Sequence, residues 1–238
     1  MKILPDWLKN GYLRLIDPVA DWCVRRGIHP NTITVIGTLC TLTGGVVYAT
    51  GHISLGGFFL GLTAIFDVLD GTVARRSGKS STFGAFLDST LDRLADGFVL
   101  GGLAVFYALN QTHHTWASVP MVVVCLLGLI GAYLTSYTRA RAEALGIDAK
   151  VGMLQRPERV VLLSVPQAFF GLTLHGVVLG AIIVILTVSA WITVYQRMAC
   201  VYRATTPTGA KAPKAEAAEA AVAPSAAAFD ARPLLKGE

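Results

Sequence analysis

Long apolar runs, separated by short polar segments, fill most of the chain. About 20 consecutive apolar residues are needed to cross roughly 30 Å of hydrocarbon, so runs of this length predict membrane-spanning helices. Glycine is frequent inside them, and small residues let helix backbones approach closely in lipid. The pattern predicts six spans, of which the fifth is short: residues 33–51, 54–74, 84–108, 117–138, 159–173 and 176–197.

The two ends of the chain have a different pattern. Residues 3–26 mix apolar and charged positions, which predicts an amphipathic helix lying in the membrane interface. From residue 204 onward the apolar periodicity gives way to alanine and proline, which predicts a disordered cytoplasmic tail. The expected fold is therefore an all-α integral membrane protein, with six transmembrane helices behind an interfacial helix in a domain over 1–203 and a tail over 204–238.

Composition and loop charge add an orientation. Only 15% of residues are charged, against about 25% in a typical soluble domain, and 53% are hydrophobic. Lysine and arginine concentrate in alternate loops, such as the one holding Arg75, Arg76 and Lys79, while the loops around 51–52 and 110–116 have neither. Positive loops stay inside the cell, so a multi-pass protein of the cell (inner) membrane with both termini cytoplasmic is expected. No basic run with interleaved aromatics occurs, so nucleic acid is not an expected partner.

Acidic residues are placed unusually. Every acid between residues 23 and 141 is an aspartate at the cytoplasmic end of the second or third predicted span. Each span carries one pair at helical spacing, i, i+3 or i, i+4, so each pair shares one helix face. Four carboxylates facing one another need cations, and hard oxygen ligands select Mg²⁺ or Mn²⁺. The pairs are Asp67 with Asp70 and Asp88 with Asp92, and Asp96 follows.

Residues beside the aspartates suit a phosphate ligand. Gly71 and Ala74 have minimal side chains, which lets a ligand approach the helix beside the metal. Arg75 supplies a fixed cation for pyrophosphate oxygens. Ser81 lies in a polar turn that offers further hydrogen-bond donors.

The segment from Asp67 to Asp92 matches every fixed position of DxxDGxxAR(x8)GxxxDxxxD, and in this it resembles the CDP-alcohol phosphotransferase family. The resemblance covers roughly residues 26–200. It implies a six-helix membrane protein, usually a homodimer in membrane lipid. Such a protein binds a CDP-linked lipid at the cytoplasmic face, transfers its phosphatidyl group to an alcohol and releases CMP.

The resemblance also implies a role for each matching residue. Asp67, Asp70 and Asp88 would ligate metal, and Asp92 would ligate a second metal and act as general base toward the acceptor hydroxyl. The expected cofactor is two Mg²⁺ ions, with Mn²⁺ as the alternative, and Asp96 is expected to have a structural role. The expected CDP-lipid site comprises Pro30, Asn31, Thr32, Ile33, Gly71, Ala74, Arg75 and Ser81.

A second group of basic residues concerns the acceptor. Arg139, Arg159 and Arg197 lie at or just within predicted helix ends, where several guanidiniums can hold a phosphate dianion. A phosphorylated alcohol is therefore favoured over serine, choline or ethanolamine. The segments SYTRARAE (136–143) and RPER (156–159) resemble those of phosphatidylinositol phosphate synthases and of archaeal relatives, although Arg139 stands where lysine is usual.

These observations predict a Mg²⁺-dependent enzyme that transfers the phosphatidyl group of CDP-diacylglycerol to an inositol phosphate. Phosphatidylglycerophosphate synthase, with glycerol 3-phosphate as acceptor, is the alternative within the family. A cation transporter is the alternative outside it, since aspartates in membrane helices also mark ion paths. Transporter sites lie near the membrane midplane, whereas these aspartates lie near one face.

Overall fold

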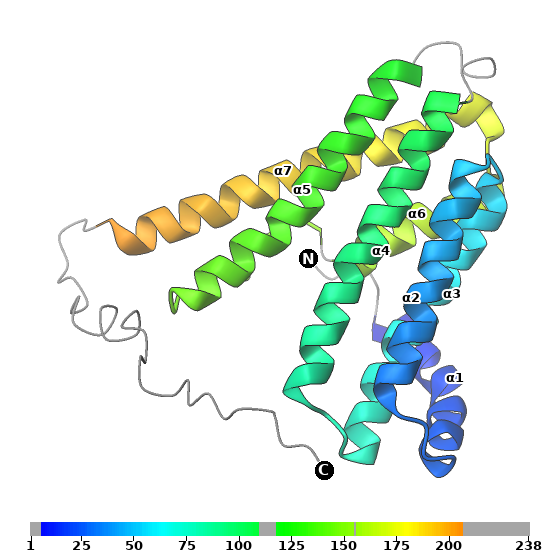
Figure 1. The fold of residues 1–238 in the computed structure, drawn as a ribbon, viewed down its shortest axis with the longest axis vertical. Helices are drawn as coiled ribbons and strands as arrows, with labels where there is room; N and C mark the ends of the chain where they lie inside the picture. Colours follow the sequence, from blue (N-terminus) through cyan, green and yellow to red (C-terminus); the bar gives the residue numbers. More distant parts are fainter. Residues whose placement is uncertain (1–5, 110–117, 155, 207–238) are drawn as a thin grey trace, which may run out of the picture.

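A computed structural model describes residues 6–109, 118–154 and 156–206. Within them the chain forms seven α-helices and one short 3₁₀ helix, so the all-helical prediction is confirmed (Figure 1). The helices are α1 (Asp6–Arg25), α2 (Pro30–Ala49), α3 (Ile53–Ser77), α4 (Thr82–Leu109), α5 (Ser118–Ala144), α6 (Arg156–Phe170) and α7 (Val177–Thr205), with the 3₁₀ helix η1 at Thr173–Gly176.

The helices pack in a connected series. α2 lies against α3 and α4, α3 against α6, and α5 against α4 and α7. In Figure 1, α2, α3 and α4 stand side by side, while α7 crosses at a slant. A core cluster around Tyr48, Leu103 and Leu179 joins helices from both halves of the chain. The Tyr48 hydroxyl donates a hydrogen bond of 2.7 Å to the Leu163 carbonyl, which ties α2 to α6.

The outer surface is apolar, as lipid requires. α2 buries its three glycines and Thr41, and it exposes Val35, Leu39 and Val46. Phe58 on α3 and Ile185 on α7 are each 57% exposed. Small residues inside and large apolar residues outside are the arrangement expected of helices packed within a bilayer.

In the part of the chain that the structure describes, four helices are long and apolar enough to cross a membrane: Pro30–Ala49, Ile53–Ser77, Val119–Ala144 and Val177–Thr205. They correspond to the first, second, fourth and sixth predicted spans. α4 has the length, but its first half carries the charges of Asp88, Asp92, Arg93 and Asp96. α6 has 15 residues, fewer than the ~20 of a full crossing, and begins three residues earlier than the predicted span. The chain turns at Gly171, whose φ of 52° is left-handed.

The expected interfacial helix over 3–26 is observed as α1, and its place in the membrane interface remains a prediction. α1 packs against α3 through Ile16, Ala20 and Cys23. Arg76 at the end of α3 adds ion pairs to Asp17 and Asp21 of α1 (2.5 and 2.6 Å). α7 continues to Thr205, two residues past the predicted domain limit at 203. Residues 207–238 of the predicted disordered tail lie outside the described residues.

Two glycines allow α2 and α4 to touch backbone to backbone. A methyl group on Gly102 would collide with the carbonyl of Gly45, and one on Gly45 would lie 2.5 Å from the carbonyl oxygen of Phe98. The neighbouring Gly101 has open space where its side chain would be. The contact joins the second half of α2 to the second half of α4, away from the end of the bundle that carries the aspartate pairs.

Gly102→Ala is therefore expected to destabilise the protein, because relieving the collision needs a backbone shift of the kind that costs about 1–3 kcal/mol. Gly101→Ala is the matched control, and it gains the ~1 kcal/mol helix preference of alanine without a collision. Thermal unfolding in detergent should give a lower Tm for Gly102→Ala and an equal or higher one for Gly101→Ala. Equal Tm values for the two variants would show that the backbone contact is unimportant.

Candidate active site

A tight connection brings the two aspartate pairs together. α3 ends where Gly78 adopts a left-handed φ of 65°, and its N–H donates to the Ala74 carbonyl. α4 begins only four residues later, and the Ser81 hydroxyl oxygen accepts a hydrogen bond of 3.0 Å from the Gly84 N–H. Since α2 packs against both helices, the end of α3 and the start of α4 lie at one end of the bundle.

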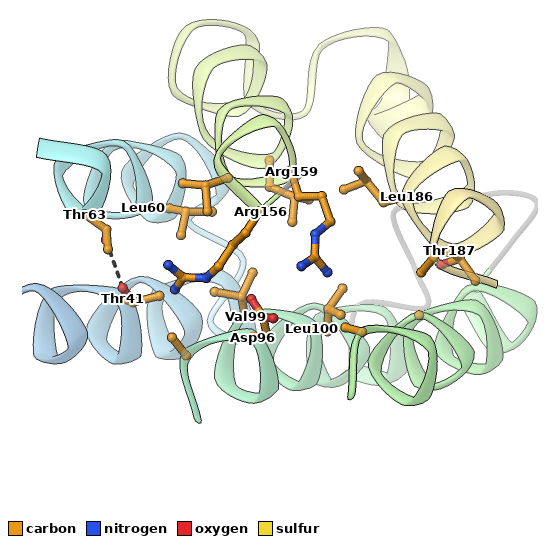
Figure 2. A pocket seen from close by; sticks show the side chains of 16 residues that line it. Thr41, Leu60, Thr63, Asp96, Val99, Leu100, Arg156, Arg159, Leu186 and Thr187 are labelled. Atoms are coloured by element: carbon orange, nitrogen blue, oxygen red, sulfur yellow. Dashed lines mark hydrogen bonds between the residues drawn. The ribbon is translucent and has the colours of Figure 1, made fainter. Parts of the chain in front are cut away.

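α6 faces this end with two arginines. Arg156 and Arg159, one helical turn apart, extend from α6 toward Asp96 on α4 (Figure 2). Together they line an internal cavity of about 40 Å³ to which all helices from α2 to α7 contribute. The Nε atoms of both arginines and Oδ2 of Asp96 are buried without a hydrogen-bond partner. The arginines therefore retain hydrogen-bonding capacity inside the molecule.

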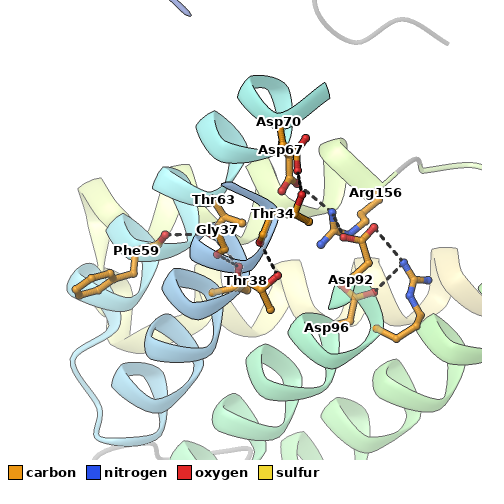
Figure 3. Close-up of polar contacts among 12 residues, drawn as sticks. Thr34, Gly37, Thr38, Phe59, Thr63, Asp67, Asp70, Asp92, Asp96 and Arg156 are labelled. Carbon is orange, nitrogen blue, oxygen red and sulfur yellow. Dashed lines mark hydrogen bonds and ion pairs between the residues drawn. The ribbon is translucent and has the colours of Figure 1, made fainter. Parts of the chain in front are cut away.

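The Arg156 guanidinium lies between the two aspartate pairs. Its Nη1 is 2.9 Å from Oδ2 of Asp67 and 2.8 Å from Oδ1 of Asp92, so one nitrogen joins α3, α4 and α6 (Figure 3). Asp70 instead accepts a hydrogen bond of 2.7 Å from the Thr34 hydroxyl of α2. Asp88 is exposed on α4.

The predicted gathering of four carboxylates is therefore only partly present. Among the described residues, no three acidic, histidine or cysteine side chains are arranged to hold a metal ion. Asp67 and Asp92 nevertheless both present an oxygen to one cation, here a guanidinium. Aspartate oxygens are the donors that Mg²⁺ and Mn²⁺ prefer, so the ligand chemistry fits a divalent ion.

The residues expected to bind a CDP lipid fall into two groups. Asn31 of α2 and Ser81 converge on Gly84, where a methyl group would lie 3.2 and 3.1 Å from their side-chain oxygens. Arg75 is exposed above Gly71 and donates to the Thr72 hydroxyl. The other expected residues differ in their accessibility to a ligand. Thr32 is exposed and Ala74 is half-buried, whereas Pro30 and Ile33 are buried.

The side chain of Ile33 packs in a cluster with Leu69 and Val73. A ligand at this position meets the start of α2 through the backbone and through Asn31 rather than through the isoleucine side chain. The sequence pattern therefore identifies residues 30–33 as a segment. It does not distinguish residues that face a ligand from residues that pack against other helices.

A larger pocket of about 1070 Å³ opens beside Asp92. The three arginines predicted for the acceptor all line it, from three different helices. Two further arginines that the sequence prediction did not assign line it as well. Its charged lining from α4 to α7 consists of Asp92, Arg93, Arg139, Glu143, Lys150, Arg156, Arg159 and Arg197.

The pocket arginines are held to different degrees. Arg197 donates to the carbonyls of Thr135 and Val151, which joins α7 to α5 and to the segment before α6. Arg139 pairs with Glu143 at 2.9 Å on the exposed side. Arg93 lies 3.7 Å from Asp92 and 3.9 Å from Asp96. Arg197 is thus held by two backbone carbonyls, whereas Arg139 is held by a half-exposed carboxylate.

Comparisons with known proteins give one consistent answer. Residues 27–202 match the family model described as CDP-alcohol phosphatidyltransferase. The phosphatidylinositol phosphate synthase of Mycobacteroides abscessus is 37% identical over 80% of this chain and 84% of its own length. That of Streptomyces avermitilis is also 37% identical, over 95% and 92%. An archaetidylinositol phosphate synthase of Methanothermobacter thermautotrophicus is 36% identical over 80% and 90%.

Solved structures agree with the sequence comparisons. The Mycobacterium tuberculosis phosphatidylinositol phosphate synthase with CDP-DAG bound superposes with a TM-score of 0.72 and 31% identity, over 84% of this chain and 99% of that one. A structure of the same protein in complex with manganese and citrate gives a TM-score of 0.71 and 30% identity, over 84% and 93%.

Gly71→Ala tests the expected donor surface. The added methyl group would lie 3.2 Å from Nη1 of Arg75, a flexible side-chain end that can move aside without disturbing the fold. We expect the Tm to stay constant and the affinity for a CDP-linked lipid to fall about tenfold, or 1.4 kcal/mol. Gly61→Ala on the same helix, with only ordinary contacts to Ser164, is the control. Equal lipid affinity in both variants would remove Gly71 from the donor site.

Proposed function

The chain belongs to the CDP-alcohol phosphatidyltransferase family, and from this premise we propose that it makes a phosphatidylinositol phosphate. It takes CDP-diacylglycerol as donor and an inositol phosphate as acceptor, and it releases CMP. The observation that carries the proposal is one pocket in which Asp92 faces Arg139, Arg159 and Arg197. An acceptor whose phosphate lies among the arginines can direct a hydroxyl toward Asp92.

Divalent metal ions are part of the proposal. Asp67, Asp70, Asp88 and Asp92 would hold two Mg²⁺ ions, or Mn²⁺ in their place. The manganese complex of the mycobacterial synthase supports a divalent metal, as does the all-oxygen donor set of this chain. When bound, the ions offset charge on the pyrophosphate and stabilise CMP as leaving group.

The side chains of the protein orient the substrates and accept the proton. Arg75 and the open surface of Gly71 orient the pyrophosphate, and Asn31 and Ser81 add polar contacts at the start of α2 and α4. Asp92 accepts the proton of the acceptor hydroxyl. The acceptor oxygen then bonds to the phosphorus that carries diacylglycerol, and the bond from that phosphorus to the CMP oxygen breaks.

The membrane arrangement follows from charge and length. We propose that α2 to α7 form six membrane helices, with α4 and α6 contributing the charged ends around the site. α1 lies in the interface, and the active site and both termini face the cytoplasm of a cell-membrane homodimer. Arg75 and Arg76 in the last turn of α3, and Arg139 and Arg197 in the pocket, lie on the side of the site and support this orientation.

An acceptor panel with purified protein tests the proposal. CMP release from CDP-diacylglycerol is compared among inositol phosphate, glycerol 3-phosphate and free inositol. The proposal predicts the highest kcat/KM with inositol phosphate and little turnover with free inositol. A higher kcat/KM with glycerol 3-phosphate would assign the chain to phosphatidylglycerophosphate synthesis instead.

Asp92→Asn tests the general base. The amide keeps the shape of the side chain but cannot take a proton, so kcat should fall at least ~10²-fold. Binding of CDP-diacylglycerol and the folded state, followed by Tm, should persist. Asp96→Asn, one turn further along α4 and outside the motif, is the matched control and should keep most of its activity. Near-normal turnover in Asp92→Asn would exclude the base role.

Arg159→Ala and Arg197→Ala test the acceptor subsite. Loss of a charge-assisted hydrogen bond costs about 1.5–3 kcal/mol, which corresponds to a roughly 10- to 150-fold higher KM for inositol phosphate. The KM for CDP-diacylglycerol should change much less. Arg141→Ala, exposed on α5 and outside the pocket, is the control. Equal rises of both KM values would indicate a general disturbance of the fold rather than an acceptor subsite.

A further inference from the structure

The Arg156 guanidinium lies between two of the aspartates that are expected to hold metal. Both of its ion pairs, to Asp67 and to Asp92, are made by the same nitrogen, Nη1, at 2.9 and 2.8 Å (Figure 3). Its Nε is buried without a partner. A planar guanidinium ordinarily engages carboxylates through two nitrogens. Here it acts as a point charge between two aspartates on different helices, which is the task of a bridging cation.

A divalent ion and this guanidinium would compete for the same two carboxylates. Oδ2 of Asp67 and Oδ1 of Asp92 both pair with Nη1, so an ion held by these two oxygens would lie where the guanidinium lies. Partly buried carboxylates on neighbouring helices repel each other unless a cation lies between them. Once a divalent ion neutralises this pair, the guanidinium is no longer needed there and is repelled by the ion's positive charge.

The displaced guanidinium can enter the large pocket beside Asp92. Arg156 is the first residue of α6 and already lines the large pocket together with Arg139, Arg159 and Arg197. An arginine side chain has several rotatable bonds, so it can change rotamer while the helix stays in place. A phosphate in that pocket offers Nη1 and the unpartnered Nε the acceptors that they lose or lack.

We propose that Arg156 is an exchangeable counter-cation that couples metal binding to acceptor binding. Without metal it neutralises Asp67 and Asp92. When a divalent ion takes those carboxylates, Arg156 turns into the pocket and binds the acceptor phosphate. The inference rests on the proposed function and deepens it, because the acceptor subsite is complete only after metal has bound.

Metal affinity gives the first test. Mn²⁺ binding to detergent-purified protein is measured by electron paramagnetic resonance, without donor or acceptor. Because Arg156→Gln removes the competitor, it should bind Mn²⁺ at least about fivefold more tightly than the wild type, the lower end of measured couplings between sites. Unchanged or weaker binding overturns the exchange. Failure of Mn²⁺ to bind either protein overturns the exchange and the metal-dependent function together.

Acceptor affinity gives the second test. This test can be made on the wild type alone if Arg156→Gln does not fold. Calorimetry of inositol phosphate binding, without donor, should show at least about fivefold tighter binding when Mn²⁺ is present, since coupling is reciprocal. In Arg156→Gln this gain should fall to less than half. Arg197 donates to the carbonyls of Thr135 and Val151 rather than to the aspartates. Arg197→Gln should therefore bind the acceptor weakly, yet its acceptor affinity should still rise when Mn²⁺ is present. Equal wild-type affinity with and without Mn²⁺ overturns the proposal even if the metal-dependent reaction is observed.

Discussion

Carboxylates at the ends of membrane helices must be neutralised, and the organisation of this molecule follows from that constraint. Asp67, Asp92 and Asp96 lie where three helices meet, with Arg156 and Arg93 among them. An ionised group at membrane depth costs several kcal/mol without a partner. Breaking a buried pair by removing one partner costs about 3–5 kcal/mol, because the remaining charge stays in place. The cation in this cluster, whether guanidinium or metal, therefore stabilises both the fold and the site.

Packing places the charges where they can meet. The glycine contact between α2 and α4 sets the spacing of those helices, and the short turn through Gly78 reverses α3 into α4. α1 is attached to the last turn of α3 by Arg76, the residue after Arg75. The proposed donor surface thus rests on α2, α3 and α4, which are consecutive in the chain. The proposed acceptor pocket also needs the later helices α5, α6 and α7.

Much of this could be predicted from the sequence because its signals are local. Apolar runs predicted the helices, and the spacing of Asp67 with Asp70 and of Asp88 with Asp92 predicted shared faces. The length of α6 was less predictable, since its first turn is charged and its end is set by a glycine conformation. The position of Arg156 between two aspartates could not be predicted, because periodicity along one helix does not tell which side chain of another helix lies opposite. The RPER segment indicated only that arginine was available there.

Metal dependence of the wild-type reaction tests the central claim most directly. Purified protein receives CDP-diacylglycerol and inositol phosphate, first in chelator and then with increasing Mg²⁺ or Mn²⁺, and CMP is measured. The account predicts no CMP above background in chelator, and release that requires both the metal and the acceptor. CMP formation that continues in chelator, or that is independent of the acceptor, would contradict a metal-dependent transfer at this aspartate cluster.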